Sequence, residues 1–146
     1  MRAALLLPLS LLLLTGCHDV FGPDDRFEGF YTYAGTVDDA VGDAVVGSIW
    51  IDDERRNTAE VTIDWEYLDL GESVLRIRSD RAAIAEVDRD GFIEFEFQGD
   101  LFIDGEVAFF RLIHVGRLRG RTLTGDWHLE TDLPTNDRGS FTARRD

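Results

Sequence analysis

The sequence predicts an all-β domain, built as an antiparallel up-and-down meander of about eight to nine short strands. Apolar and charged residues alternate with a period of two, most clearly in "AEVTIDWEY" from Ala59 to Tyr67. Asp-Gly dipeptides at 90–91 and 104–105 supply the positive φ that tight hairpins need. No stretch after residue 16 keeps a convincing helical period, because glycines interrupt the nearest candidate, "DDAVGDAVV".

The alternation between successive turn signals gives the strands in order. We expect them over residues 27–37, 45–52, 58–68, 73–79, 82–88, 92–98, 106–115, 122–130 and 139–145. Free strand edges promote aggregation, so a meander of this length must either close on itself or form two packed sheets. We therefore expect a closed β-barrel domain over residues 27–146, with a β-sandwich as the alternative.

The first 16 residues predict an export signal rather than a part of the fold. Arg2 precedes an apolar run that is broken by Pro8 and followed by small residues. A membrane-spanning helix needs about 20 apolar residues to cross the hydrocarbon layer, and this run is shorter. A charged start, a short apolar run and small residues are typical of a signal peptide, which we place over residues 1–16.

Cys17, the only cysteine of the chain, follows this run directly in Leu14-Thr15-Gly16-Cys17. These four residues resemble the lipobox of bacterial lipoproteins. The resemblance implies that the Cys17 thiol receives a diacylglycerol, that the signal is cut before it, and that the new amino group is acylated, as by palmitate. Residues 17–26 would then be the lipidated N-terminus and its tether. Two or three acyl chains anchor a protein stably in a bilayer.

The residue after the lipobox cysteine bears on the location. In the lipoprotein family an aspartate there often signals retention in the inner membrane, and this chain has His18. The resemblance therefore implies an exported protein of the cell envelope, anchored in the outer membrane and facing the periplasm or the cell surface.

The net charge excludes one class of partner. The formal net charge is −14 at pH 7, and a field of this sign repels nucleic acids. We expect no nucleic-acid binding, and the lipid bilayer is the partner that acylated Cys17 implies.

The two ends of the domain resemble the lipocalins and related calycin barrels. "FEGFYTYAG" resembles their opening G-x-W strand, with Gly29 at the glycine and Tyr31 where the motif has tryptophan. "GSFTARR" resembles their closing strand, in which an arginine packs over the opening aromatic ring, and Arg144 is the matching candidate. Together with "LRGRTLTGDWHL", the closing segment also resembles uncharacterised small bacterial lipoproteins. The resemblance implies a calycin-like β-barrel.

Large aromatic residues gather on the predicted inward faces of the strands. In an eight-stranded barrel they either fill the core or line an apolar pocket. The candidates for lining a ligand pocket are Tyr31, Trp65, Phe95, Phe97 and Trp127. We therefore expect a binding domain for a small apolar or amphipathic ligand. The alternative is a protein-interaction module with a packed core, such as an envelope inhibitor or an accessory subunit.

Two pairs of arginines stand out in this acidic chain. Arg76 and Arg78 share one strand face, and Arg117 and Arg119 share another. Together the two pairs are candidates for a clamp on an anionic group. The simpler expectation is cross-strand pairing with the many carboxylates.

The sequence offers no convincing catalytic or metal-binding set, so we expect neither an enzyme nor a cofactor. The domain has only His114 and His128, and neither lies near a nucleophile motif such as G-x-S-x-G. His128 shares its strand face with Asp126 and Glu130, a pattern more typical of a solvated surface than of a zinc site. In "EVDRDGFIEFEF" the twelfth position of a calcium loop is Phe97 instead of glutamate, which favours a plain hairpin turn.

Overall fold

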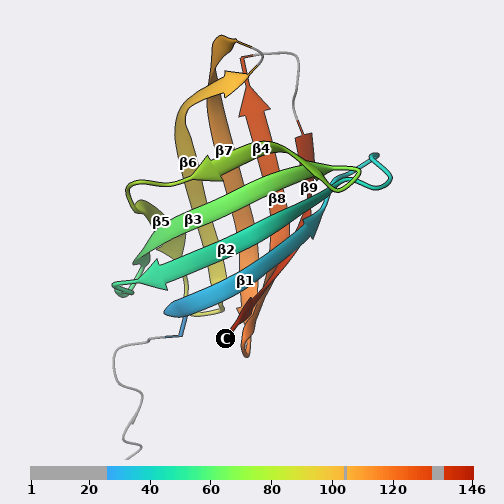
Figure 1. Ribbon diagram of the computed structural model, residues 1–146. Coiled ribbons are helices and arrows are strands. Elements are labelled where there is room, and N and C mark those ends of the chain that lie inside the picture. The colour runs from blue at the N-terminus through green and yellow to red at the C-terminus, as the bar shows by residue number, and fades with distance from the viewer. Residues whose placement is uncertain (1–25, 104, 133–136) are drawn as a thin grey trace, which may run out of the picture.

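The computed structural model describes residues 26–103, 105–132 and 137–146 of the chain. Its regular elements in this part of the chain are all strands, and Figure 1 shows them wrapped into one barrel. They are β1 (Gly29–Thr36), β2 (Ala44–Asp52), β3 (Thr58–Asp69), β4 (Glu72–Arg78), β5 (Ala83–Val87), β6 (Phe92–Ile103), β7 (Glu106–Arg119), β8 (Thr122–Thr131) and β9 (Asp137–Arg145). Each corresponds to one of the nine predicted strands. No helix in the described ranges is long and apolar enough to cross a membrane.

The strands form one antiparallel sheet that closes on itself. The order is β2-β1-β9-β8-β7-β6-β5-β3-β4, and β2 also pairs with β3. Closure therefore runs through eight strands and leaves β4 as an extra strand that pairs with β3 alone. The prediction of an all-β barrel is confirmed, and the alternative of a sandwich is wrong.

β6 and β7 run several residues further than expected. β6 was expected to end at residue 98 and β7 at residue 115, whereas they reach Ile103 and Arg119. Gly99, the first residue beyond the expected strand, pairs with Phe110 in the ladder. Its missing side chain is compensated by that neighbour, because the Phe110 ring packs over the glycine.

The glycines of the two Asp-Gly turns adopt the backbone conformation that the sequence predicts. Gly91 and Gly105 adopt positive φ of 88° and 87° at the two Asp-Gly turns. At the first turn, Asp88 accepts hydrogen bonds at Oδ1 from the backbone N–H groups of Asp90 and Phe92, each at 2.8 Å. This confirms a hairpin turn at the segment that was compared with a calcium loop.

The inward faces of the strands form one continuous core. The rings of Trp65 and Trp127 meet edge to face with their centroids 5.4 Å apart, and Tyr33 stacks on Phe141 at 5.1 Å. Gly125 lets β8 lie close to β7, because a Cβ at this position would be 2.0 Å from the carbonyl oxygen of Val115. The predicted inward aromatic faces are thus confirmed as the core.

The barrel has two ends, which we call proximal and distal. The proximal end carries residues 26–28, the connections at 53–57, 88–91 and 120–121, and Asp146; the distal end carries the connections at 37–43 and 70–71 and the outer ends of β6, β7 and β8. In Figure 1 the proximal end lies at the lower left and bottom, on the side of the label that marks the C-terminus.

Residues 26–28 close the proximal end. The Phe27 side chain is completely buried, its N–H donates to Glu54 at 2.6 Å, and its carbonyl accepts from the Tyr31 hydroxyl at 2.7 Å. Arg145 Nη1 donates to the carbonyl of Glu28 at 3.0 Å. These contacts fix residues 26–28 across this end of the barrel.

The arginine that packs over the opening strand is Arg145, not Arg144. In the β1–β9 ladder Tyr31 pairs with Arg145, whereas Arg144 pairs with the outward Thr32. A Cβ at Gly29 would lie 2.6 Å from Cδ of Arg145, so the arginine covers the glycine. The expected position, Arg144, is therefore wrong by one residue. A shift of one residue along a strand moves a side chain to the opposite face of the sheet.

Candidate functional site

The five aromatic candidates for lining a pocket all lie in the barrel core. Tyr31, Trp65, Phe95 and Trp127 are at most 2% exposed, and Phe97 is 7% exposed. The structure brings Trp65 together with Trp127, and Phe95 together with Phe97 at 5.9 Å between centroids. Most of these rings therefore pack on one another, and only Phe97 reaches the cleft described below.

A buried polar pair lies among these rings, and the sequence reasoning did not single it out. His114 is completely buried, with its ring stacked on Phe95 at 4.8 Å between centroids. Its Nε2 is 3.2 Å from the hydroxyl of Tyr33, while Nδ1 has no hydrogen-bond partner among the described residues. Burial lowers the pKa of His114 to about 3, and burial also raises the pKa of Tyr33. The period-two pattern of β7, which places His114 in line with Leu112, was the signal for this inward position.

The sheet splits on one side of the barrel. β3 pairs with β5 through its residues 58–61 and with β4 through its residues 64–69. β6 pairs with β5 only through Glu94 and Ile93, and its ladder with β7 continues to Ile103. In Figure 1 β4 runs at a steep angle to β6. The two strands diverge from each other, and a cleft opens between them.

This cleft has a volume of about 540 Å³. We call it the side cleft. Its apolar part consists of Ile77 from β4, Phe97 from β6 and Phe110 from β7, all three of them buried. Its polar part is formed by Arg78, Ser79, Asp80, Arg81, Glu96, Gln98 and Asp100. The side cleft therefore combines an apolar interior surface with a charged rim.

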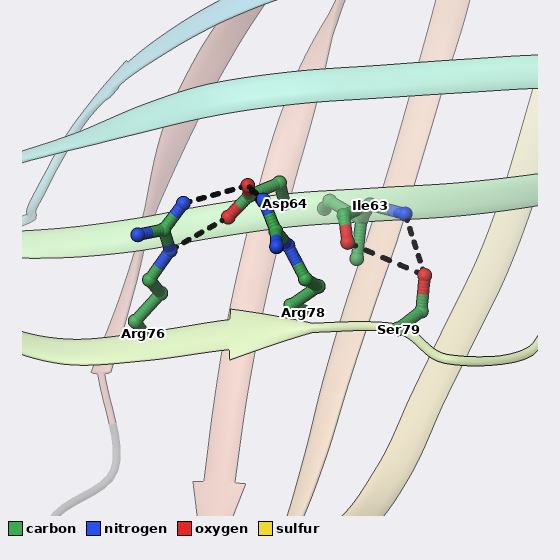
Figure 2. A network of polar contacts seen from close by, with 5 residues as sticks. All are labelled: Ile63, Asp64, Arg76, Arg78 and Ser79. Carbon is green, nitrogen blue, oxygen red and sulfur yellow. Dashed lines mark hydrogen bonds and ion pairs between the residues drawn. The ribbon is translucent and has the colours of Figure 1, made fainter.

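One wall of the side cleft is fixed by a polar network on β3 and β4. Figure 2 shows Arg76 and Arg78 both directed at the carboxylate of Asp64. Arg76 binds both carboxylate oxygens, at 2.9 and 2.7 Å, and Arg78 binds Oδ2 at 2.7 Å. The hydrogen bond from Arg76 is the largest cause that lowers the pKa of Asp64 to about 2. The expected cross-strand pairing with carboxylates is confirmed for this arginine pair.

Ser79 fixes the segment that follows β4. Its N–H donates to the carbonyl of Ile63 at 2.9 Å. Figure 2 shows that its hydroxyl also accepts from the N–H of Ile63 at 2.8 Å and donates to the Ile63 carbonyl at 3.3 Å. This exchange ends the β4 part of the ladder and fixes the point where the chain turns into residues 79–82, which form a side of the cleft.

The opposite wall is braced by Arg111 on β7. Its guanidinium binds Glu96 with two hydrogen bonds of 3.0 and 2.8 Å, and it binds Glu130 at 2.9 Å. The hydrogen bond from Arg111 is the main reason that the pKa of Glu96 is lowered. Arg78 and Glu96 therefore line the cleft while each is engaged in an ion pair.

The other candidates lie elsewhere. Arg117 and Arg119 are exposed on β7, which does not pair with β4, so the two arginine pairs do not share adjacent strands. His128 and Asp126 are exposed on β8, while Glu130 is occupied by Arg111. Among the residues that the structure describes, no group of three or more His, Cys, Asp or Glu could hold a metal ion. Cys17 lies outside the described residues.

Comparisons with known proteins show the fold alone. No protein family matches the chain, and no curated protein matches it. Among solved structures it is similar to a redesigned β-barrel, mFAP1, bound to DFHBI. The two share 12% sequence identity with a TM-score of 0.56, over 84% of this chain and 98% of that chain.

Proposed function

We propose that this protein is a lipid-anchored envelope protein whose barrel binds a small amphipathic molecule in the side cleft. The observation that carries the proposal is the split of the sheet between β4 and β6, which opens a cleft of about 540 Å³ onto buried apolar side chains. Ligand sites in proteins are typically concave and mostly apolar, with a few polar groups that fix orientation.

The chemistry of the cleft supports an amphipathic ligand. Ile77, Phe97 and Phe110 offer an apolar surface, on which each buried Å² of ligand contributes about 25 cal/mol. At the rim, Arg78 and Glu96 keep their ion pairs. Asp80, Arg81 and Asp100 are left to face a polar group of the ligand.

The side cleft is favoured over the centre of the barrel because aromatic side chains already occupy the centre. Trp65, Trp127 and Phe95 contact other rings and are almost fully buried. The redesigned β-barrel with a similar fold was solved bound to DFHBI, which supports the capacity of such a barrel to hold a small molecule.

Attachment to the membrane through Cys17 is part of the proposal. It rests on the signal-like residues 1–16 and on the lipobox resemblance. Cys17→Ala is expected to leave the protein unprocessed or in the soluble fraction, measured by envelope fractionation and by the mass of the mature N-terminus. Membrane retention of this variant at the wild-type level would contradict the anchoring.

Native mass spectrometry of the full mature protein, extracted from its own envelope, tests the ligand site. We expect an additional small mass that is lost on denaturation. Ala82→Trp places an indole in the cleft and should remove that mass. Ile84→Trp is the matched control, because Ile84 is exposed nearby and does not line the cleft. An equal ligand load in both variants, or a bare mass for the wild type, would contradict binding in the cleft.

A protein-interaction module is the second candidate function. The observation that favours it is the apolar outer surface at the end of the β6–β7 hairpin, where the paired residues Phe102 and Val107 are 75% and 65% exposed. Exposed apolar patches often mark protein contacts. Loss of a co-purifying envelope protein from Phe102→Ser, with the ligand mass unchanged, would support this function. We propose no catalytic activity.

A further inference from the structure

We propose that the proximal end of the barrel lies against the phospholipid surface of the membrane that holds Cys17, with Phe30 and Trp50 as its apolar contact. The inference rests on the proposed anchoring and goes beyond it, since an anchor alone leaves the orientation of the barrel open. Three observations support one orientation: the reach of the chain, the position of the exposed aromatic pair and the distribution of charge.

The reach of the chain sets how far the proximal end can be from the lipid. Eight residues, 18–25, separate Cys17 from Arg26, and an extended chain spans at most about 3.6 Å per residue. The link therefore reaches no more than roughly 30 Å. The first described residues lie at the proximal end, where Phe27 is buried and fixed. This end of the barrel must stay near the bilayer.

The exposed aromatic pair lies on the outer face at this end. Phe30 and Trp50 are ladder partners near the start of β1 and the end of β2, and their ring centroids are 6.2 Å apart. They are 39% and 50% exposed. The hollow beside them is lined by Ser48 and Thr62, whose hydroxyls can donate hydrogen bonds to phosphate oxygens, and by the ion pair of Asp64 and Arg78. Tryptophan is enriched where a protein meets the membrane–water interface.

The charges are distributed unequally between the two ends. Arginines at the proximal end come from segments far apart in the sequence: Arg55, Arg56, Arg89, Arg121 and Arg144. The proximal end also carries acids that balance these arginines: Glu28, Asp53, Glu54, Asp88, Asp90 and Asp146. The distal connections and strand ends carry acids that are largely unbalanced: Asp38, Asp39, Asp69, Glu72, Glu106 and Asp132. Of the described residues in or next to the distal connections, Arg138 is the only arginine.

This asymmetry favours one orientation at a phospholipid surface. Arginine binds phosphate oxygens in a bidentate manner, and arginines near the surface of a bilayer with anionic lipids are attracted to it. Acids at the proximal end, such as Asp53 in its ion pair with Arg55, leave that end close to neutral. The acidic distal end is repelled by the same surface, so the barrel points away from the membrane with its distal end in solution.

Trp50 can report this contact directly. The chain has three tryptophans, and Trp65 and Trp127 are buried in the core. The experiment uses the full mature lipoprotein in vesicles of phosphatidylethanolamine and phosphatidylglycerol with bromine atoms on the acyl chains. We expect bromine to quench part of the tryptophan emission, and we expect Trp50→Phe to abolish the quenched part while the protein stays bound.

A second variant moves the reporter to the opposite end. Phe102→Trp in the Trp50→Phe background places an exposed indole on the distal β6–β7 hairpin, and its emission should not be quenched. Equal quenching at residues 50 and 102, or an unquenched Trp50 on vesicle-bound protein, would overturn the orientation and leave the aromatic pair to a protein partner. Protein that carries no lipid and stays in solution would overturn the anchoring itself, so the two failures are distinguishable.

Discussion

The buried histidine couples the stability of this barrel to pH. The ring of His114 is enclosed by Phe95, Phe141 and Tyr33, and burial lowers its pKa to about 3. In the unfolded chain a histidine has a pKa of about 6.5. Between these two values the unfolded chain binds a proton that the folded barrel does not. The free energy of unfolding therefore falls as the pH drops from 6.5 towards 3.

Replacement of His114 by Phe should reduce this pH dependence. A phenyl ring can keep the stack on Phe95 and takes up no proton, so the slope of unfolding free energy against pH should decrease by up to about 1.4 kcal/mol per pH unit between 6.5 and 3. Urea denaturation at a series of pH values measures this slope. An unchanged slope in His114→Phe would show that the histidine is protonated as easily in the barrel as in the unfolded chain.

Asp64→Asn is the matched control for that series. The pKa of Asp64 is lowered to about 2, so its contribution to stability is present above the unfolded value near 3.8 and is lost as the pH falls through 2. The variant should be less stable than the wild type by a constant amount above about pH 3.8, and the slope of unfolding free energy against pH should change only between about 3.8 and 2. Its effect should be small, roughly 0.5–1 kcal/mol, because its arginine partners are largely exposed to solvent.

At the scale of the strand, the sequence predicts those features that are determined by residues adjacent in the chain. Period-two alternation and Asp-Gly turns were enough to place nine strands, because both are local properties of the backbone. The extension of β6 past Gly99 could not be predicted, since it depends on the packing of Phe110 from the next strand. The choice between Arg144 and Arg145 depended on the register of β9 against β1, which a one-residue shift reverses.

The close approach of β7 and β8 depends on one glycine. A Cβ at Gly125 would lie 2.0 Å from the Val115 carbonyl oxygen, which is part of the backbone and cannot move without disturbing the ladder. Gly125→Ala should therefore lower the free energy of unfolding by about 1–3 kcal/mol or more, the usual cost of overpacking.

Gly99→Ala serves as the comparison for that variant. The new Cβ would lie 3.2 Å from a ring atom of Phe110, and a side chain at the edge of the side cleft can shift. This substitution should cost clearly less in the same denaturation experiment. An equal loss of unfolding free energy in the two variants would contradict this prediction, because it would show that separating β8 from β7 costs no more than a shift of the Phe110 ring.

At the scale of the whole molecule, the position of a cavity is the property that a sequence predicts least well. Inward faces can be assigned residue by residue, and all five aromatic candidates are buried as that assignment requires. Whether inward rings leave a space depends on how their volumes sum inside a closed shape. The side cleft arises from a different cause, since β3 is long enough to pair with both β4 and β5 along one edge.

Because the sheet splits between β4 and β6, the closure of the barrel is weakest where β5 pairs with β6. These strands pair only at Glu86 with Glu94 and at Val87 with Ile93, whereas the β6–β7 ladder runs from Phe92 to Ile103. Local opening follows the number of buried contacts and hydrogen bonds that must break. Amides of β5 should therefore exchange with deuterium much faster than those of β7 and β8, and a molecule bound in the side cleft should slow exchange at residues 79–83. Equal protection of amides in all strands would contradict this prediction. It would show that the short β5–β6 ladder is as stable as the long ladders and that the side cleft does not weaken the closure of the barrel.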